Sequence, residues 1–139
     1  MRAIKLGVLL GFVFSFLMIS CRKEDKKEVE KDLAVQFKVV SVQNAVIKSA
    51  VVQIGTKQKI DYTVTGTSWA SEVRTVNTSA KFLSIAATGL SANNDSQLMV
   101  QIWVNGIMVA QDIGEVNAGS TNLSAKAYLN LNDLEILAF

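Results

Sequence analysis

Apolar side chains recur at every second position along residues 97–104, and this period most constrains the fold. In "LMVQIWV" the aliphatic residues from Leu98 to Val104 alternate with three others, Met99, Gln101 and Trp103. A β-strand directs successive side chains to opposite faces, so this segment predicts a strand with one face covered.

An Asn-Gly pair directly follows this run. Asn105 and Gly106 can both adopt positive φ, as a two-residue type I′ turn requires, and apolar residues flank them in "WVNGIMV". The sequence therefore predicts a β-hairpin formed by residues 97–104 and 107–113.

Two other segments show the same alternation, "KIDYTVTG" at 59–66 and "AKAYLNL" at 125–131. Turn-forming residues separate the predicted strands at 54–57, 66–68, 87–96 and 116–120. We therefore expect residues 33–139 to form one all-β domain, a single antiparallel β-sandwich. It should have about seven or eight strands and an immunoglobulin-like outline. A small β-barrel is the alternative.

The chain has no proline, although edge strands often use it. The lysines are predicted to protect sheet edges instead, at positions 38, 48, 57, 59, 81 and 126. The terminal "LEILAF" fits either a last strand or a short helical turn.

Residues 1–20 have the features of a secretory signal peptide. Arg2 and Lys5 precede an apolar run of 14 residues at 6–19, and the small residue Ser20 follows it. A helix needs about 20 apolar residues to cross a bilayer, so this run is short. A membrane anchor helix that is retained is the alternative.

Cys21, the only cysteine of the chain, stands where the apolar run ends. The residues "MISC" resemble the lipobox of bacterial lipoproteins. That resemblance implies a diacylglyceryl thioether on Cys21, cleavage before it, and acylation of the new amine, with palmitate as a typical chain. Two or more acyl chains hold a protein stably on a membrane. An ordinary cysteine near an ordinary cleavage site is the alternative.

A charged tether follows the cysteine. Ten of the eleven residues at 22–32 are charged, so residues 21–32 are predicted to be a lipidated cysteine and a flexible tether. In Gram-negative lipoproteins an aspartate directly after the cysteine often means inner-membrane retention, and Arg22 stands there instead. The resemblance therefore implies the outer membrane. It leaves open whether the protein is anchored in the periplasmic or in the surface-exposed leaflet.

The mature chain is close to neutral. The precursor has 14 basic and 12 acidic residues, and removal of Arg2 and Lys5 leaves 12 of each. Binding to nucleic acid depends on excess positive charge, so nucleic acid is not an expected partner.

The folded part also resembles MmpS-type transport accessory proteins over about residues 60–131. "DYTVTGTSWASEVRTVNTS" is similar to the family's "Y-x-VTGT … V-x-x-x-N" segment. "VQIWVNGIMVAQDIGEVNAGSTNLSAKAYL" is similar to its hairpin and final strands. MmpS-type proteins assist export pumps, so the resemblance implies a non-enzymatic accessory role in the envelope.

Catalytic residues are scarce. The sequence has no histidine, and Cys21 is assigned to lipid, which removes the usual general base, thiolate nucleophile and zinc ligands. Carboxylates after residue 32 form no known motif, and Asp112 and Glu115 lack the spacing of a calcium loop. We therefore expect no enzyme activity, no cofactor and no metal. Two carboxylates facing each other in a closed cleft would revive the enzyme alternative.

Trp103 and Trp69 are the candidate binding residues. Trp103 lies on the strand face opposite the aliphatic residues, where it is either covered by the other sheet or by residues 134–139, or exposed to a partner. The predicted function is an accessory or binding subunit of an envelope or transport complex. The alternative is a surface-displayed module that binds glycan or host protein through exposed aromatics. A concave face with both tryptophans would favour this alternative.

Overall fold

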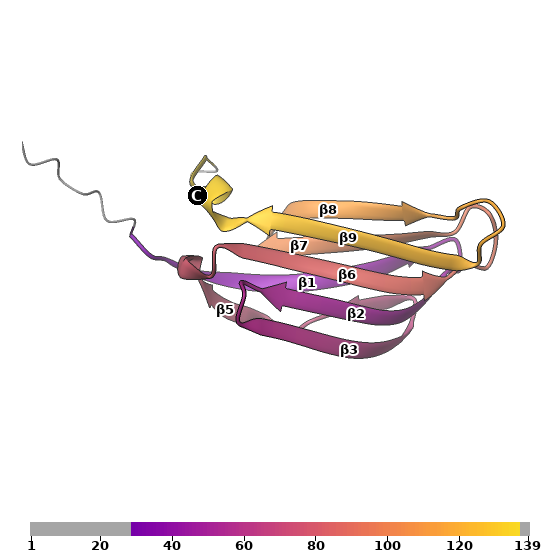
Figure 1. Ribbon diagram of the computed structural model, residues 1–139, viewed down its shortest axis with the longest axis horizontal. Helices are drawn as coiled ribbons and strands as arrows, with labels where there is room; N and C mark the ends of the chain where they lie inside the picture. Colours follow the sequence, from indigo (N-terminus) through magenta and orange to yellow (C-terminus); the bar gives the residue numbers. More distant parts are fainter. Residues whose placement is uncertain (1–28, 137–139) are drawn as a thin grey trace, which may run out of the picture.

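The computed structural model describes residues 29–136, with side chains described as far as Leu134. The predicted signal peptide, Cys21 and most of the tether lie outside the described residues. Two antiparallel sheets pack face to face (Figure 1). The predicted antiparallel β-sandwich is thus confirmed. No helix within residues 29–136 is both long enough and apolar enough to span a bilayer.

Sheet A contains five strands. Its main path runs, in spatial order, through β4 (Ser68–Ala70), β1 (Asp32–Val42), β7 (Gln97–Val104) and β8 (Ile107–Glu115). The fifth strand, β5 (Arg74–Asn77), pairs with the first residues of β1, on the same side as β4. The long strand β1 therefore has two short strands, one after the other, as its outer neighbours.

Sheet B contains four strands. Their spatial order is β3 (Gln58–Gly66), β2 (Val46–Ile54), β6 (Phe82–Leu90) and β9 (Asn122–Asn130). Two short 3₁₀ helices complete the described part, η1 (Thr78–Ala80) and η2 (Leu131–Ile136). "LEILAF" thus begins within a helical turn, and its last three residues lie outside the described residues.

The core fills the space between the sheets and follows the predicted alternation. Its largest fully buried side chains include Phe37, Ile47, Leu83, Ile85, Leu98 and Ile102. Burying one such side chain contributes roughly 1.5–3 kcal/mol relative to leaving it in water. The strand period therefore determines which face of each sheet turns inward.

Residues 29–136 form nine strands, where about seven or eight were predicted. The two shortest, β4 and β5, both lie within residues 68–77. Ser71 lies between them, and its backbone N–H donates to Phe37 O at 2.8 Å. Strand pairing within the described residues leaves the two sheets separate, so the barrel alternative is wrong.

The break predicted at 87–96 was placed too early, because β6 continues to Leu90. Gly89 lies inside this strand, and a Cβ there would come within 2.6 Å of Val46 O. The glycine therefore permits a close approach of β2 and does not mark a turn.

The predicted hairpin is confirmed as β7 and β8. Asn105 has φ 51° and Gly106 has φ 80°, as a type I′ turn needs. The Asn105 side-chain oxygen accepts a hydrogen bond from Ala34 N at 3.0 Å, so the turn is also attached to β1.

Four of the six lysines predicted at sheet edges lie elsewhere, and two of these, Lys57 and Lys81, are outside the strands. Lys38 is on β1 and Lys48 is on β2, and both strands are interior. Lys59 on β3 and Lys126 on β9 do lie on border strands. The type of residue alone could not show which strands would be interior.

Candidate binding surface

The outer face of sheet A carries nine side chains in a regular three-by-three arrangement, which we call the grid. They come from β1, β7 and β8, and the strand register aligns them in rows. The rows are Gln36, Trp103 and Met108; then Lys38, Gln101 and Gln111; then Val40, Met99 and Ile113.

Trp103 is fixed by two neighbours in the grid. Its indole Nε1 donates a hydrogen bond to Gln101 Oε1 at 3.0 Å. The Lys38 Nζ lies 4.0 Å from the ring centroid, which is a cation–π arrangement. The indole is half-buried and oriented before any partner arrives.

Gln101 is the central residue of the grid. Its Nε2 donates to Gln111 Oε1 at 3.0 Å, and the same nitrogen lies 3.2 Å from Met99 Sδ. Since its Oε1 accepts from Trp103, both ends of the amide have partners within the protein. The polar centre of the grid is therefore preorganised.

The outer face of sheet B provides the contrast. Its rows consist mainly of small and polar side chains, among them Thr63, Ser49, Thr88, Ser124, Ala86 and Ser84. Its exposed aromatic is Tyr128, which is 59% exposed and stacks on Phe82 at 5.5 Å. In the grid, Met108 and Ile113 are each 41% exposed; Met108 lies opposite the half-buried Trp103, and Ile113 lies two rows away. Sheet B also exposes Val46 and Leu90, at 38% and 39%, so the grid differs from it chiefly in presenting a tryptophan.

Trp103 is covered neither by sheet B nor by the described part of η2. Sheet B packs on the opposite face of sheet A, and η2 packs against β6, β9 and η1. Of the two positions open from the sequence, the structure places Trp103 on the outer face.

Trp69 points the other way. It pairs with Val39, which is fully buried, so its side chain is directed between the sheets. Its ring lies 4.7 Å from that of Tyr62 on β3. The two tryptophans occupy opposite faces of sheet A, so they do not form the concave face that would favour the alternative of a glycan- or host-protein-binding module.

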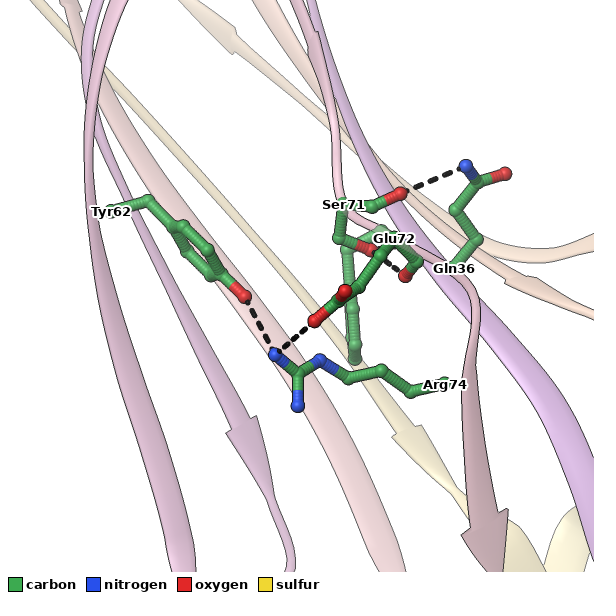
Figure 2. Close-up of polar contacts among 6 residues, drawn as sticks. Gln36, Tyr62, Ser71, Glu72 and Arg74 are labelled. Atoms are coloured by element: carbon green, nitrogen blue, oxygen red, sulfur yellow. Dashed lines mark hydrogen bonds and ion pairs between the residues drawn. The ribbon is translucent and has the colours of Figure 1, made fainter.

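Arg74 completes the cluster around Tyr62 (Figure 2). Its Nη2 donates to Glu72 Oε1 at 2.8 Å and to the Tyr62 hydroxyl at 3.3 Å. Nearby, Gln36 Nε2 donates to Ser71 O at 2.9 Å. The Arg74 Nε is buried without a partner. The cluster joins the border strands of the two sheets, and its ion pair is too exposed to add much stability.

A small cleft lies beside the turn between β2 and β3. Its volume is about 290 Å³. Ile54 and Val76 belong to its lining, as do Thr56, Lys57 and Ser79. The lining contains no carboxylate, and no group of three metal-ligating side chains occurs in the described part of the chain. The cleft therefore lacks the two facing carboxylates that the enzyme alternative requires.

Asp112 and Glu115 instead make local contacts. Asp112 Oδ2 accepts a hydrogen bond from Lys126 N at 2.9 Å, and Glu115 Oε1 accepts one from Gln97 at 3.3 Å.

The chain matches no protein-family model, and no curated protein matches it. Its function therefore has to be inferred from the grid and from the sequence.

Sequence reasoning identified Trp103 but missed Lys38, which lies over its ring. Lys38 comes from another strand, and only the register brings it beside the indole. The signal available in the sequence was the alternation, which put Lys38 on the same face of β1 as Gln36 and Val40.

Proposed function

We propose that this protein is a non-enzymatic lipoprotein of the cell envelope that binds a partner protein through the grid. In this proposal lipid on Cys21 holds it on the outer membrane of a Gram-negative bacterium. The charged tether at 22–32 separates the sandwich from the lipid surface. The resemblance to MmpS-type proteins favours a partner in an envelope or transport complex.

The half-buried Trp103 opposite exposed Met108, on a face that also exposes Ile113, is the observation that carries the partner proposal. Tryptophan is among the residues that contribute most to protein interfaces, particularly when surrounding contacts exclude water. The indole is already fixed by Gln101 and Lys38, so little conformational freedom is lost on binding.

A protein partner is favoured over a glycan by the position of Lys38. Stacking on a sugar needs a free indole face, and the Lys38 ammonium already lies over the ring at 4.0 Å. The indole N–H is also occupied, by Gln101 Oε1. A protein partner can contact Met108, Ile113 and Val40 while the Lys38 contact and the Gln101 hydrogen bond of Trp103 both remain in place.

The lipid anchor is tested by changing Cys21. In the full chain, Cys21→Ser keeps a similar size but cannot form the thioether, so incorporation of a labelled fatty acid should fall to background. The measurement is label per protein in cells, with the wild-type chain as reference. Wild-type labelling of the variant would disprove the lipoprotein proposal.

The partner surface is tested by replacing Met108 in the full chain with a photo-crosslinking residue and irradiating intact cells. We expect a discrete, protease-sensitive adduct from position 108 and none from position 128 on the outer face of sheet B. Trp103→Ala should reduce the adduct at least 10-fold, as expected for an anchor residue. Tyr128→Ala, the matched aromatic change on sheet B, should leave it unchanged.

The measured stability of Trp103→Ala shows whether a lost adduct reflects a lost binding surface or an unfolded protein. Trp103→Ala should lower the free energy of unfolding by about 2 kcal/mol, as expected for a half-buried aromatic residue, and leave the protein folded. A protease-resistant adduct would favour the glycan alternative. An adduct that survives Trp103→Ala would show that the grid is not the binding surface.

A further inference from the structure

Each of the two sheets has two borders at which another strand could pair, and three of these four borders are protected. β8 and β9 cover each other along one side of the sandwich, where Lys126 N donates to Asp112 Oδ2. On sheet A the opposite border consists of β4 and β5, which have only three and four residues. Very short edge strands and inward-pointing charges are known protections against strand pairing.

β3 is the long border strand, and no charge points inward from it; its one lysine, Lys59, lies on the outer face two residues from Asp61. The strand runs for nine residues from Gln58 to Gly66, and within the sandwich it pairs only with β2. Figure 1 shows it along the lower border of the molecule. The chain has no proline to interrupt it, and its pairing with β2 is regular from Gln58 to Thr63. Backbone groups of an unprotected edge strand can pair with another strand.

The side chains of β3 also favour an added strand. Ile60 and Tyr62 point inward but remain half-buried, because the short strands opposite do not cover them fully. Lys59 and Asp61 are exposed on the outer face. The one ion pair among the described side chains joins Arg74 and Glu72, so these two charges have no ionic partner.

We propose that β3 pairs in antiparallel orientation with β3 of a second copy of this chain, centred on Ile60. In this register Lys59 lies opposite the partner's Asp61, and Asp61 lies opposite the partner's Lys59. Two reciprocal ion pairs form on the outer face, and the two Ile60 side chains meet on the inner face. The two B sheets then form one continuous sheet.

The charges select this register over its neighbours. Only every second register keeps the inward side chains on the inner face, so the two nearest alternatives shift the partner strand by two residues in either direction. One neighbouring register places Asp61 opposite the partner's Asp61, and the other places Lys59 opposite the partner's Lys59. Like charges directly opposite each other are destabilising, whereas opposite charges stabilise a cross-strand pair. Only the register centred on Ile60 places both charges opposite partners of the other sign.

Charge reversal in the full chain tests the pairing. The protein is purified in detergent and its protein mass is measured across a dilution series. The wild type should be a dimer. Asp61→Lys should raise the dissociation constant at least 10-fold, since it places two lysines opposite each other. The double variant Lys59→Asp with Asp61→Lys should return the constant to within about threefold of wild type. Asp95→Lys, an exposed charge reversal in the loop between β6 and β7, is the matched control and should remain dimeric.

Cysteine crosslinking tests the register. Opposed residues in an antiparallel pair have Cα atoms about 4.5–5.5 Å apart, within the range that a disulfide spans. Ile60→Cys should therefore form a disulfide-linked dimer under mild oxidation. Thr63→Cys should not, because in this register the two positions are roughly 20 Å apart at about 3.3 Å per residue.

Three results would overturn the proposal. The first is a monomeric wild type without crosslinking at position 60, which would leave β3 for a strand of another protein. The second is a dimer that Asp61→Lys leaves intact. The third is efficient crosslinking of Tyr62→Cys in place of Ile60→Cys, which indicates a register centred on Tyr62, in which Lys59 and Asp61 lie opposite threonines.

Discussion

Along one side of the sandwich β8 and β9 lie in close contact (Figure 1). Along the other side, β3 contacts the short strands β4 and β5 through side chains, Tyr62 with Trp69 and with Arg74. The first side, the close border, uses small residues: a Cβ on Gly114 would collide with Ser124 O. The second side, the bridged border, uses large residues: Tyr62 packs on Trp69 and receives a hydrogen bond from Arg74.

This difference determines which backbone groups remain available. At the close border the two strands cover each other's edges, and Asp112 accepts directly from the backbone of Lys126. At the bridged border the contacts between sheets are made by side chains, so they leave the outer edge of β3 unpaired. An open edge therefore follows from closing that side with aromatic side chains.

The largest expected effect is at the close border. Gly114→Ala adds a methyl group against Ser124 O, a backbone atom of a strand that is paired with β6. The strands must separate, and overpacking of this kind costs about 3 kcal/mol. For a domain of this size we expect the melting temperature to fall by about 10–20 °C.

Glu115→Ala is the matched control on the same strand. It removes an exposed side chain, and we expect a change within about 0.5 kcal/mol. If denaturant unfolding shows that Gly114→Ala lowers the free energy of unfolding by less than about 1 kcal/mol, the border is not closely packed.

Local patterns in the sequence predicted most of the fold. Alternation placed Val100 and Ile102 in the core, and Asn105–Gly106 correctly located the hairpin. These features depend on neighbouring residues, so a single segment contains the required information. Gly89 was misinterpreted because a glycine that permits close strand contact looks the same in sequence as one in a turn.

The surroundings of the binding candidates depend on pairing between distant segments. Lys38 and Trp103 are 65 positions apart, and the register of β1 with β7 brings them together. Trp69 was known to follow a turn, but its direction depends on pairing with Val39. Strand order is not encoded in any one segment, so the sequence could name both tryptophans but could not assign their faces.

The second expected effect is at the bridged border and is smaller. Trp69→Ala removes a ring that packs against Tyr62 and the core, but Trp69 is only half-buried. Full burial of an aromatic residue would make its loss cost about 3–5 kcal/mol, so we expect about 2 kcal/mol here. Tyr62→Phe is the matched control: it keeps the ring contact and removes only the 3.3 Å hydrogen bond from Arg74, which should cost about 0.5 kcal/mol. Denaturant unfolding of both variants measures the two contributions. If Tyr62→Phe destabilises the protein as much as Trp69→Ala, the polar link and not the aromatic contact holds the bridged border together. If neither variant changes stability, the bridged border does not help to hold sheets A and B together, in contrast to the close border at Gly114.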